Sequence, residues 1–310
     1  IAAASYGAKL ASYCGGFRAK SSEPILIGQI QLYLKNDQNF EKKFKQKKEF
    51  ILKEANKKHK SLVARGGGAK DLSYYYLDEI KCLVVNIHIH TCEAMGANIV
   101  NTICEDLSPI LLKLFPQSKV GLRILSNLCD RRVTRAECEI SAESLSTNEY
   151  TGSEVIDRII KAWEFAWHDP YRAATHNKGV MNGVDPVVIA TGNDWRAIEA
   201  GAHAFCSFKG KYRPLTKWQK KSKNLLYGSI EIPLALGTIG GITCLHPGAK
   251  YCLEIMKNPS SRELAEIIAS VGLSQNFSAL RALAVEGIQK GHMNLHKSNK
   301  ISQKISLNLH

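Results

Sequence analysis

The sequence predicts an α+β fold in which a small domain is inserted into a larger one. Within residues 25–126 the expected elements follow the order strand, helix, strand, strand, helix, strand, which is typical of a ferredoxin-like βαββαβ unit. Helical patterns dominate the chain after residue 126, where they alternate with turns rich in glycine and asparagine. We therefore expect a small domain over 25–126 and a large mixed α/β domain formed by 1–24 and 127–290.

The elements of the small domain follow from periodicity. Residues 29–34 alternate polar and apolar side chains, as in a half-buried strand. Residues 40–58 place apolar residues on one helix face and lysines over much of the rest; we expect a solvated lysine face, with a polyanion site as the alternative. Residues 61–65 lead into a turn at 66–68, and a strand over 79–91, a helix over about 94–114 and an apolar strand over 120–128 follow.

The large domain is expected to be mainly helical. A helix over 153–168 stops at Asp169 and Pro170, because proline cannot continue the backbone hydrogen bonds of a helix. The further expected elements are a strand over 228–234 and helices over 195–206, 247–257, 260–271 and 275–291.

Composition and charge narrow the class of protein. Of the 310 residues, 45% are hydrophobic and 23% are charged, and no apolar run approaches the roughly 20 residues that cross a bilayer, so we expect a soluble protein. Nine cysteines without a CxxC pair suit a reducing cytosol, so we expect a cytoplasmic location. The net charge of +14 favours a polyanionic partner, whether a nucleic acid, membrane phosphates or a cofactor that carries several phosphates.

Standard nucleotide signatures are absent, because the sequence has neither GxGxxG after a strand nor a GxxxxGK[ST] loop. Residues 93–98, EAMGAN, instead stand between a strand and a helix, where free helix N–H groups could hold dinucleotide phosphates; close packing of the helix on the sheet is the alternative. His88, His90 and Cys92 share one strand face, and we interpret them as a polar sheet face rather than a metal site because no fourth ligand is evident.

A second group of polar residues lies in the segment 171–196. Lys178 could place a positive charge beside a developing oxyanion. Asp194 could pair with Lys178 or simply cap the helix that follows it. The other polar residues of this segment are Arg172, His176, Asn177, Asn182 and Asn193. The glycines between them suggest a site built from loops.

Three later motifs leave their interpretation open. The glycines of GTIGGITCLHP, residues 237–247, allow close approach of a ligand or form a tight turn before a helix. Gln275 and Asn276 could cap a helix or line a site. His292 and His296 share a helix face; they are surface histidines, or His292 is a general acid.

Taken together, these segments resemble class II 3-hydroxy-3-methylglutaryl-coenzyme A (HMG-CoA) reductase along nearly the whole chain. The resemblance rests on nine runs that occur in the order of the family. These are EAMGAN, SNL, ATHNKG, MNG, TGNDWRA, EAGAHA, GGITCLHP, GLSQN and GHMNLH. An ordered series of this kind is far more specific than any one motif.

The resemblance implies that two hydride transfers from NADH or NADPH reduce the HMG-CoA thioester to mevalonate and free coenzyme A. It implies that Lys178 stabilises the oxyanion, Asp194 holds Lys178, and His292 protonates the departing thiolate. The positions expected to contact the substrate are Arg172, Asn182, Asn127 and Gln275. The dinucleotide is expected on Glu93, Ala94, Met95, Gly96, Ala97 and Asn98, within the small domain.

Further expectations concern the cofactor and the partners. Glu93 replaces the aspartate usual in the family, and a carboxylate that faces the adenosine ribose would repel a 2′-phosphate, which favours NADH. The family builds its active site across a dimer interface, so the resemblance implies a homodimer or a higher homo-oligomer. We expect no metal, no membrane and no nucleic acid as a partner.

The chain also differs from the family pattern in two respects. The family carries a catalytic glutamate in a Glu-Pro-Ser segment that would directly precede Ile1, and its C-terminal flap continues beyond GHMNLH, so that 291–310 corresponds to the start of that flap. We therefore expect the chain to bind ligands with little turnover. A protein that only binds coenzyme A or a dinucleotide is accordingly the alternative to a reductase, and the reductase reaction could run in either direction.

Overall fold

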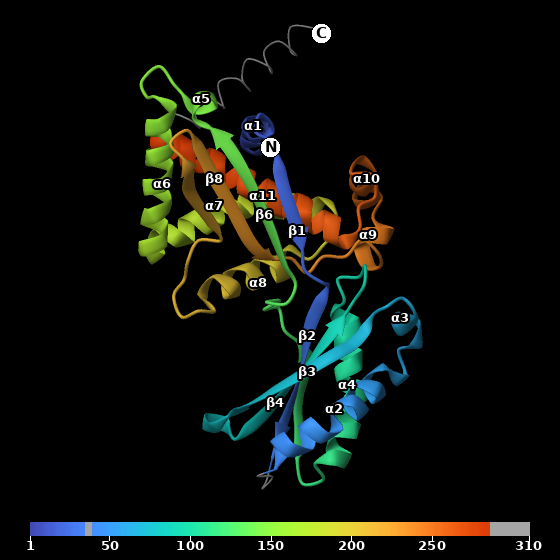
Figure 1. Cartoon of the computed structure of the whole chain (residues 1–310). Coiled ribbons are helices and arrows are strands. Elements are labelled where there is room, and N and C mark those ends of the chain that lie inside the picture. Colours follow the sequence, from blue (N-terminus) through green and yellow to red (C-terminus); the bar gives the residue numbers. More distant parts are fainter. Residues whose placement is uncertain (35–38, 286–310) are drawn as a thin grey trace.

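Two four-stranded antiparallel sheets organise the chain (Figure 1). The computed structural model describes residues 1–34 and 39–285. One sheet and its helices form a small lobe, and the other sheet, with helices packed on and around it, forms a large lobe. The protein is therefore of the mixed α+β class, as predicted.

The small lobe contains one continuous stretch of chain. Its elements are β2 (Ile25–Tyr33), α2 (Phe40–Lys57), α3 (Lys60–Ala64), β3 (Gly68–Leu77), a 3-10 turn (Asp78–Ile80), β4 (Cys82–His90), α4 (Ala97–Leu114) and β5 (Lys119–Leu125). The strands are ordered β3-β4-β2-β5 and every neighbouring pair is antiparallel. The predicted order of strand, helix, strand, strand, helix, strand is present, but the short helix α3 was not predicted and β3 was not given a range in the sequence.

Helix α2 packs one apolar face against the small-lobe sheet and α4. Phe44, Ile51 and Ala55 are buried in this face, and the ring of Phe44 stacks on Tyr74 and Phe115 with centroids 4.9 and 5.2 Å apart. Lysines on the opposite side pair with acids of the same lobe, as Lys48 does with Asp71 at 2.5 Å. The lysine face is thus solvated and partly neutralised, which agrees with the first of the two interpretations.

The large lobe is built from both ends of the described chain. Its elements are α1 (Ala2–Ser12), β1 (Phe17–Ser21), β6 (Val133–Ser141), α5 (Ala142–Leu145), α6 (Gly152–His168), α7 (Pro170–Ala190), α8 (Trp195–Ser207), β7 (Thr216–Ser222), β8 (Leu225–Pro233), α9 (Gly241–Leu245), α10 (Pro247–Ile255) and α11 (Ser261–Val285). Its sheet is ordered β1-β6-β8-β7. Within 1–34 and 39–285, no helix combines the length and hydropathy needed to cross a bilayer.

A buried polar cluster joins the long helices to the sheet of the large lobe. Asn276 of α11 accepts hydrogen bonds from the indole of Trp218 at 2.9 Å and from the hydroxyl of Thr216 at 3.0 Å. The imidazole Nε2 of His176 on α7 lies 2.6 Å from Thr216 Oγ1 and 3.0 Å from Asn276 Nδ2. This cluster fixes α7 and α11 against β7, so the outward face of α7 is also fixed.

Three sequence predictions for the large lobe are wrong. The segment expected to form glycine-rich turns is the single helix α7, and Gly183 inside it packs closely on Gln275 of α11. The helices expected over 260–271 and 275–291 are one helix, α11, in the described residues; 286–291 lies outside them. Gln275 and Asn276 therefore lie inside a helix and do not cap one. Strands β1, β6 and β7 were not predicted.

Two phenylalanines of α2 provide a test of this packing. Phe44 is 1% exposed and Phe50 is 46% exposed. Phe44→Ala should lower the free energy of unfolding by about 3–5 kcal/mol, because it removes a buried ring and leaves a cavity. Phe50→Ala should change it by less than about 0.5 kcal/mol. Urea denaturation followed by circular dichroism measures both, and similar losses for the two variants would contradict the packing of α2.

Candidate active site

Three of the motif segments meet where the two lobes join. The backbone N–H of Gly237 donates to Asn193 Oδ1 at 2.8 Å, and the N–H of Thr238 donates to the carbonyl of Glu93 at 2.9 Å. A side chain at Gly237 would collide with the backbone of Met95, so this contact requires glycine. The structure thus brings 93–98, 191–194 and 237–243 together, although they are far apart in the sequence. Gly237 thus allows its own backbone and the backbone of Met95 to approach each other closely.

The buried side chain of Arg132 holds this junction together. Its guanidinium donates to Thr91 Oγ1 at 3.2 Å, to the carbonyls of Ala94 and Met95 at 3.4 and 3.1 Å, and to the carbonyl of Leu236. Burial lowers the pKa of Arg132 to about 10, so the group keeps its charge at neutral pH. One cation therefore connects the loop after β4 to the loop after β8.

Sequence reasoning missed Arg132, although a signal was present. Thr134, Ala136, Cys138 and Ile140 of β6 are buried at alternate positions, and Arg132 falls in phase with them. Its neighbour Arg131 is out of phase and exposed. An arginine in register with a buried strand face needs buried acceptors, and here the carbonyls of the junction supply them.

The N-terminus of α4 lies directly beside the junction. Gly96 precedes the helix with φ of 103°, and a side chain there would collide with Thr91. The N-cap residue of α4 makes no side-chain hydrogen bond to the helix. The first backbone N–H groups of α4 are therefore available to an anion. Ala97 is half-buried and Asn98 is exposed. Gly96 thus packs closely on Thr91, and the binding of phosphates at this end of α4 stays a prediction.

The Glu93 carboxylate points towards the large lobe. Its Oε2 accepts a hydrogen bond from the backbone N–H of Ser261 at 2.5 Å and one from Thr238 Oγ1 at 3.4 Å. Ser261 is the first residue of α11, so the carboxylate also stabilises the positive end of that helix. The glutamate side chain thus reaches a helix terminus, and its expected contact with an adenosine ribose stays a prediction.

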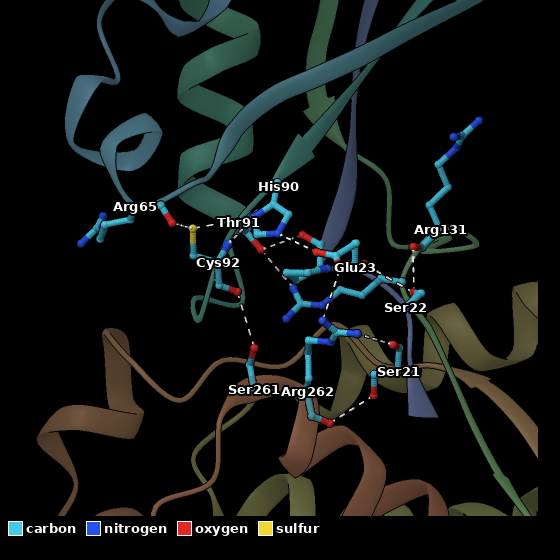
Figure 2. Close-up of polar contacts among 12 residues, drawn as sticks. Ser21, Ser22, Glu23, Arg65, His90, Thr91, Cys92, Arg131, Ser261 and Arg262 are labelled. Atoms are coloured by element: carbon cyan, nitrogen blue, oxygen red, sulfur yellow. Dashed lines mark hydrogen bonds and ion pairs between the residues drawn. The ribbon is translucent and has the colours of Figure 1, made fainter. Parts of the chain in front are cut away.

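A cavity of about 310 Å³ opens beside this junction. It lies between the loop after β4 and the start of α11, and Figure 2 shows the polar side chains around it. Its charged and sulfur-bearing lining residues are Glu23, Arg65, His90, Cys92, Glu93 and Arg262. The predicted dinucleotide segment thus borders a cavity with both acidic and basic groups.

Helix α7 sorts the polar residues of the ATHNKG and MNG motifs onto two faces. His176 and Asn177 face the interior, and burial lowers the pKa of His176 to about 3, so its imidazole stays neutral. Lys178 and Asn182 are exposed, four residues apart and on one face. Arg172 is half-buried, and burial lowers its pKa. Only part of the polar set is therefore available to a ligand.

Lys178 and Asp194 do not pair within one chain. The Asp194 carboxylate caps α8 by accepting from the N–H groups of Arg196 and Ala197 at 3.1 and 3.2 Å. The backbone N–H of the neighbouring Asn193 donates to the carbonyl of Val188. Val188 comes ten residues after Lys178, which is roughly 15 Å along α7. Among residues 1–34 and 39–285, no ion pair joins the two groups. Within the described residues Asp194 thus acts as a helix cap, and its expected role of holding Lys178 stays a prediction.

The remaining expected substrate residues lie near α7 and α8. Gln275 is half-buried and packs against Gly183, one position after Asn182. Asn127 is exposed, and its carbonyl lies against Gly201 of α8. His292 lies outside the described residues.

Asp185 is a titratable group that sequence reasoning did not single out. It lies on α7 three residues after Asn182, and burial together with the nearby Glu199 carboxylate raises its pKa to about 7. A carboxyl group with a pKa of about 7 can take up or release a proton near neutral pH, and this one lies about two helical turns after Lys178 on α7. No motif spacing in the sequence points to it.

The three side chains considered as a metal set do not converge on one point, since His88 bonds a different partner from His90 and Cys92, whose side chains contact each other. His88 Nε2 lies 3.0 Å from Ser73 Oγ, and His90 Nε2 lies 3.1 Å from Glu23 Oε2. In the described part of the chain, no group of three or more histidine, cysteine or acidic side chains could hold a metal ion.

Comparison with known proteins shows the family to which the chain belongs. The family profile described as hydroxymethylglutaryl-coenzyme A reductase matches residues 1–297. The chain belongs to this family, and its solved relatives place it in class II.

The relatives match most of the chain. The 3-hydroxy-3-methylglutaryl-coenzyme A reductase of Archaeoglobus fulgidus is 45% identical over 302 residues, which are 96% of this chain and 68% of that protein. The probable reductase of Borreliella burgdorferi is 37% identical over 276 residues, which are 89% of this chain and 63% of that protein. The class II reductase of Streptococcus pneumoniae, solved with NADPH in open conformations, superposes with a TM-score of 0.89 at 46% identity, over 95% of this chain and 72% of that one.

Adjacent arginines test the junction. Arg132→Met should lower the free energy of unfolding by about 3 kcal/mol or more, because several buried acceptors lose their donor. Arg131→Met, at the exposed neighbouring position, should change it by less than about 0.5 kcal/mol. Urea denaturation compares the two variants, and equal effects would rule out the bridging role of Arg132.

Proposed function

We propose that the protein reduces HMG-CoA to mevalonate and coenzyme A with a nicotinamide dinucleotide as hydride donor. The observation that carries the proposal is the junction, where the EAMGAN, TGNDWRA and GGITCLHP segments of a class II reductase lie together. The reductase activity named for the Archaeoglobus fulgidus relative and the NADPH bound by the Streptococcus pneumoniae enzyme support it. The same chemistry in reverse would consume mevalonate.

The two lobes divide the work in this proposal. The small lobe, within 25–126, binds the dinucleotide, and its phosphates lie at the N-terminus of α4. The large domain, formed by 1–24 and 127–290, binds the coenzyme A ester. Glu93 takes part by fixing the segment 93–98 to α11, and its carboxylate does not meet the ribose.

This direction of Glu93 bears on the choice of cofactor. The expected preference for NADH depended on a carboxylate that repels a 2′-phosphate. The carboxylate is engaged by Ser261 and Thr238, and the adjoining cavity contains Arg65 and Arg262. We therefore propose that NADPH is accepted as well as NADH.

Lys178 carries the central chemical role. Each hydride transfer places negative charge on the former carbonyl oxygen, and a fixed ammonium group stabilises that charge. Asn182 on the same face, with Arg172 and Gln275 nearby, would orient the substrate. The coenzyme A sulfur leaves as a thiolate, and a proton from His292 would prevent it from attacking the aldehyde again.

We propose that Asp194 reaches Lys178 from a second copy of the chain. Among the described residues no ion pair joins the two groups, and both are exposed. Large apolar side chains flank them on the same surface: Tyr171 is 85% exposed, Ile189 56% and Trp195 43%. Apolar groups of this size beside functional residues are typical of an interface. A homodimer would cover them and complete the site.

Binding without turnover remains the alternative function. A protein of this kind would bind coenzyme A and a dinucleotide but would not oxidise NAD(P)H when HMG-CoA is added. Absorbance of the reduced dinucleotide and calorimetric binding, measured on the same sample, separate the two functions. Salt-sensitive binding of DNA or RNA without either ligand would contradict both.

Lys178→Ala tests the mechanism. This variant should lose turnover by at least about 100-fold while its circular dichroism is unchanged, because an exposed side chain contributes little to folding. Lys161→Ala, which removes another exposed lysine from α6, should keep the wild-type rate. Near-normal oxidation of NADPH by Lys178→Ala would refute the assignment of the oxyanion role.

A further inference from the structure

Cys92, His90 and Glu23 form a hydrogen-bonded series at the edge of the junction cavity (Figure 2). The Sγ of Cys92 lies 3.7 Å from Nδ1 of His90, and Nε2 of His90 lies 3.1 Å from a Glu23 carboxylate oxygen. Arg262 of α11 pairs with the other oxygen of Glu23 at 3.2 Å. A thiol, an imidazole and a carboxylate thus stand in the order found where a base activates a nucleophile.

The hydrogen bonds define the protonation of the imidazole. The backbone N–H of Cys92 donates to Nδ1 of His90 at 3.2 Å, so Nδ1 carries a lone pair. Nε2 then carries the hydrogen and donates it to Glu23. The thiol lies 3.7 Å from the same nitrogen and 3.5 Å from the Arg65 carbonyl, so the Nδ1 lone pair is shared between the Cys92 N–H and the thiol and can accept the thiol proton when Sγ turns to it.

The backbone of Cys92 is held in an unusual conformation. Its φ is 54°, in the left-handed region that residues other than glycine seldom adopt. Two contacts keep it there: Ser261 Oγ bonds the Cys92 carbonyl at 3.5 Å, and the thiol lies 3.5 Å from the carbonyl of Arg65. Strain of this kind is concentrated at functional positions, and here it directs a half-buried thiol to the cavity.

We propose that Cys92 is a nucleophilic thiol that forms mixed disulfides with low-molecular-weight disulfides, and that the adduct in the cavity excludes the dinucleotide. His90 Nδ1 takes the thiol proton as Sγ attacks one sulfur of the reagent. The new S–S bond forms while the old one breaks, Cys92 is oxidised, and the departing thiolate is reduced and receives the proton from His90. A thiol reductant reverses the reaction.

The effect on the dinucleotide follows from position. Cys92 directly precedes the segment 93–98, and Glu93 and Ala94 line the same cavity. A tripeptide attached to Sγ would therefore fill space beside the N-terminus of α4. This consequence rests on the proposed function, whereas the reactivity of the thiol does not.

The chain contains its own reference thiol. Cys244 is exposed and Cys92 is only half-buried, so exposure alone predicts faster modification of Cys244. Cys244 accepts a hydrogen bond from the N–H of Gly240 at 3.0 Å. Among the described residues, no histidine contacts its sulfur. A faster reaction at Cys92 would therefore report activation by His90.

Oxidised glutathione and peptide mass spectrometry test the reactivity. We expect Cys92 to form the adduct about tenfold faster than Cys244, because the thiolate is the reacting species. His90→Asn and Glu23→Gln should each slow Cys92 and leave Cys244 unchanged. Equal rates at the two cysteines, or rates at Cys92 that neither variant lowers, would overturn the proposal.

NADPH fluorescence measures the effect on binding. Glutathionylated protein should lose NADPH binding and regain it with dithiothreitol, whereas Cys92→Ser should bind NADPH before and after the same treatment. Unchanged binding by protein with a complete adduct at Cys92 would overturn the exclusion of the dinucleotide. If untreated protein binds no NADPH, the proposed function fails, and the rates at Cys92 and Cys244 still decide the reactivity.

Discussion

A buried guanidinium connects the two lobes of the protein. Arg132 satisfies carbonyl groups of Ala94 and Met95 on one side and of Leu236 on the other, and these backbones approach because Gly237 has no side chain. An unpaired buried cation would be costly, so the charge is stable only while both loops are in place. Together with the bonds of Glu93 to Thr238 and Ser261, this interaction sets the position of the segment 93–98 relative to the large lobe.

A second buried cluster determines which residues the large lobe presents to solvent. His176, Thr216 and Asn276 bind one another between α7, β7 and α11, and they fix the rotation of α7 about its axis. Lys178 and Asn182 therefore face outwards. No ion pair joins Lys178 to Asp194 within the described residues. Interior hydrogen bonds thus leave the proposed catalytic cation on the surface of the lobe, where a second chain could approach it.

The sequence predicted the small lobe more fully than the large one. The alternation of β2 and the single apolar face of α2 are strong periodic signals. Strand β7 has only Thr216 and Trp218 buried among exposed lysines, and α11 contains buried Ser274 and Asn276, which resemble a break. Motif order indicated the residues of the candidate site, but it could not show that Glu93 turns to α11 or that Lys178 and Asp194 lie apart. Those distances depend on tertiary packing.

Mixed dimers test the central claim that Lys178 and Asp194 meet only across two chains. Lys178→Ala and Asp194→Asn should each be inactive alone. Co-expressed with different tags and purified through both, they form dimers in which one site combines the intact Lys178 of one subunit with the intact Asp194 of the other. The account predicts that these dimers oxidise NADPH with HMG-CoA. Mixed dimers as inactive as either single variant would contradict it.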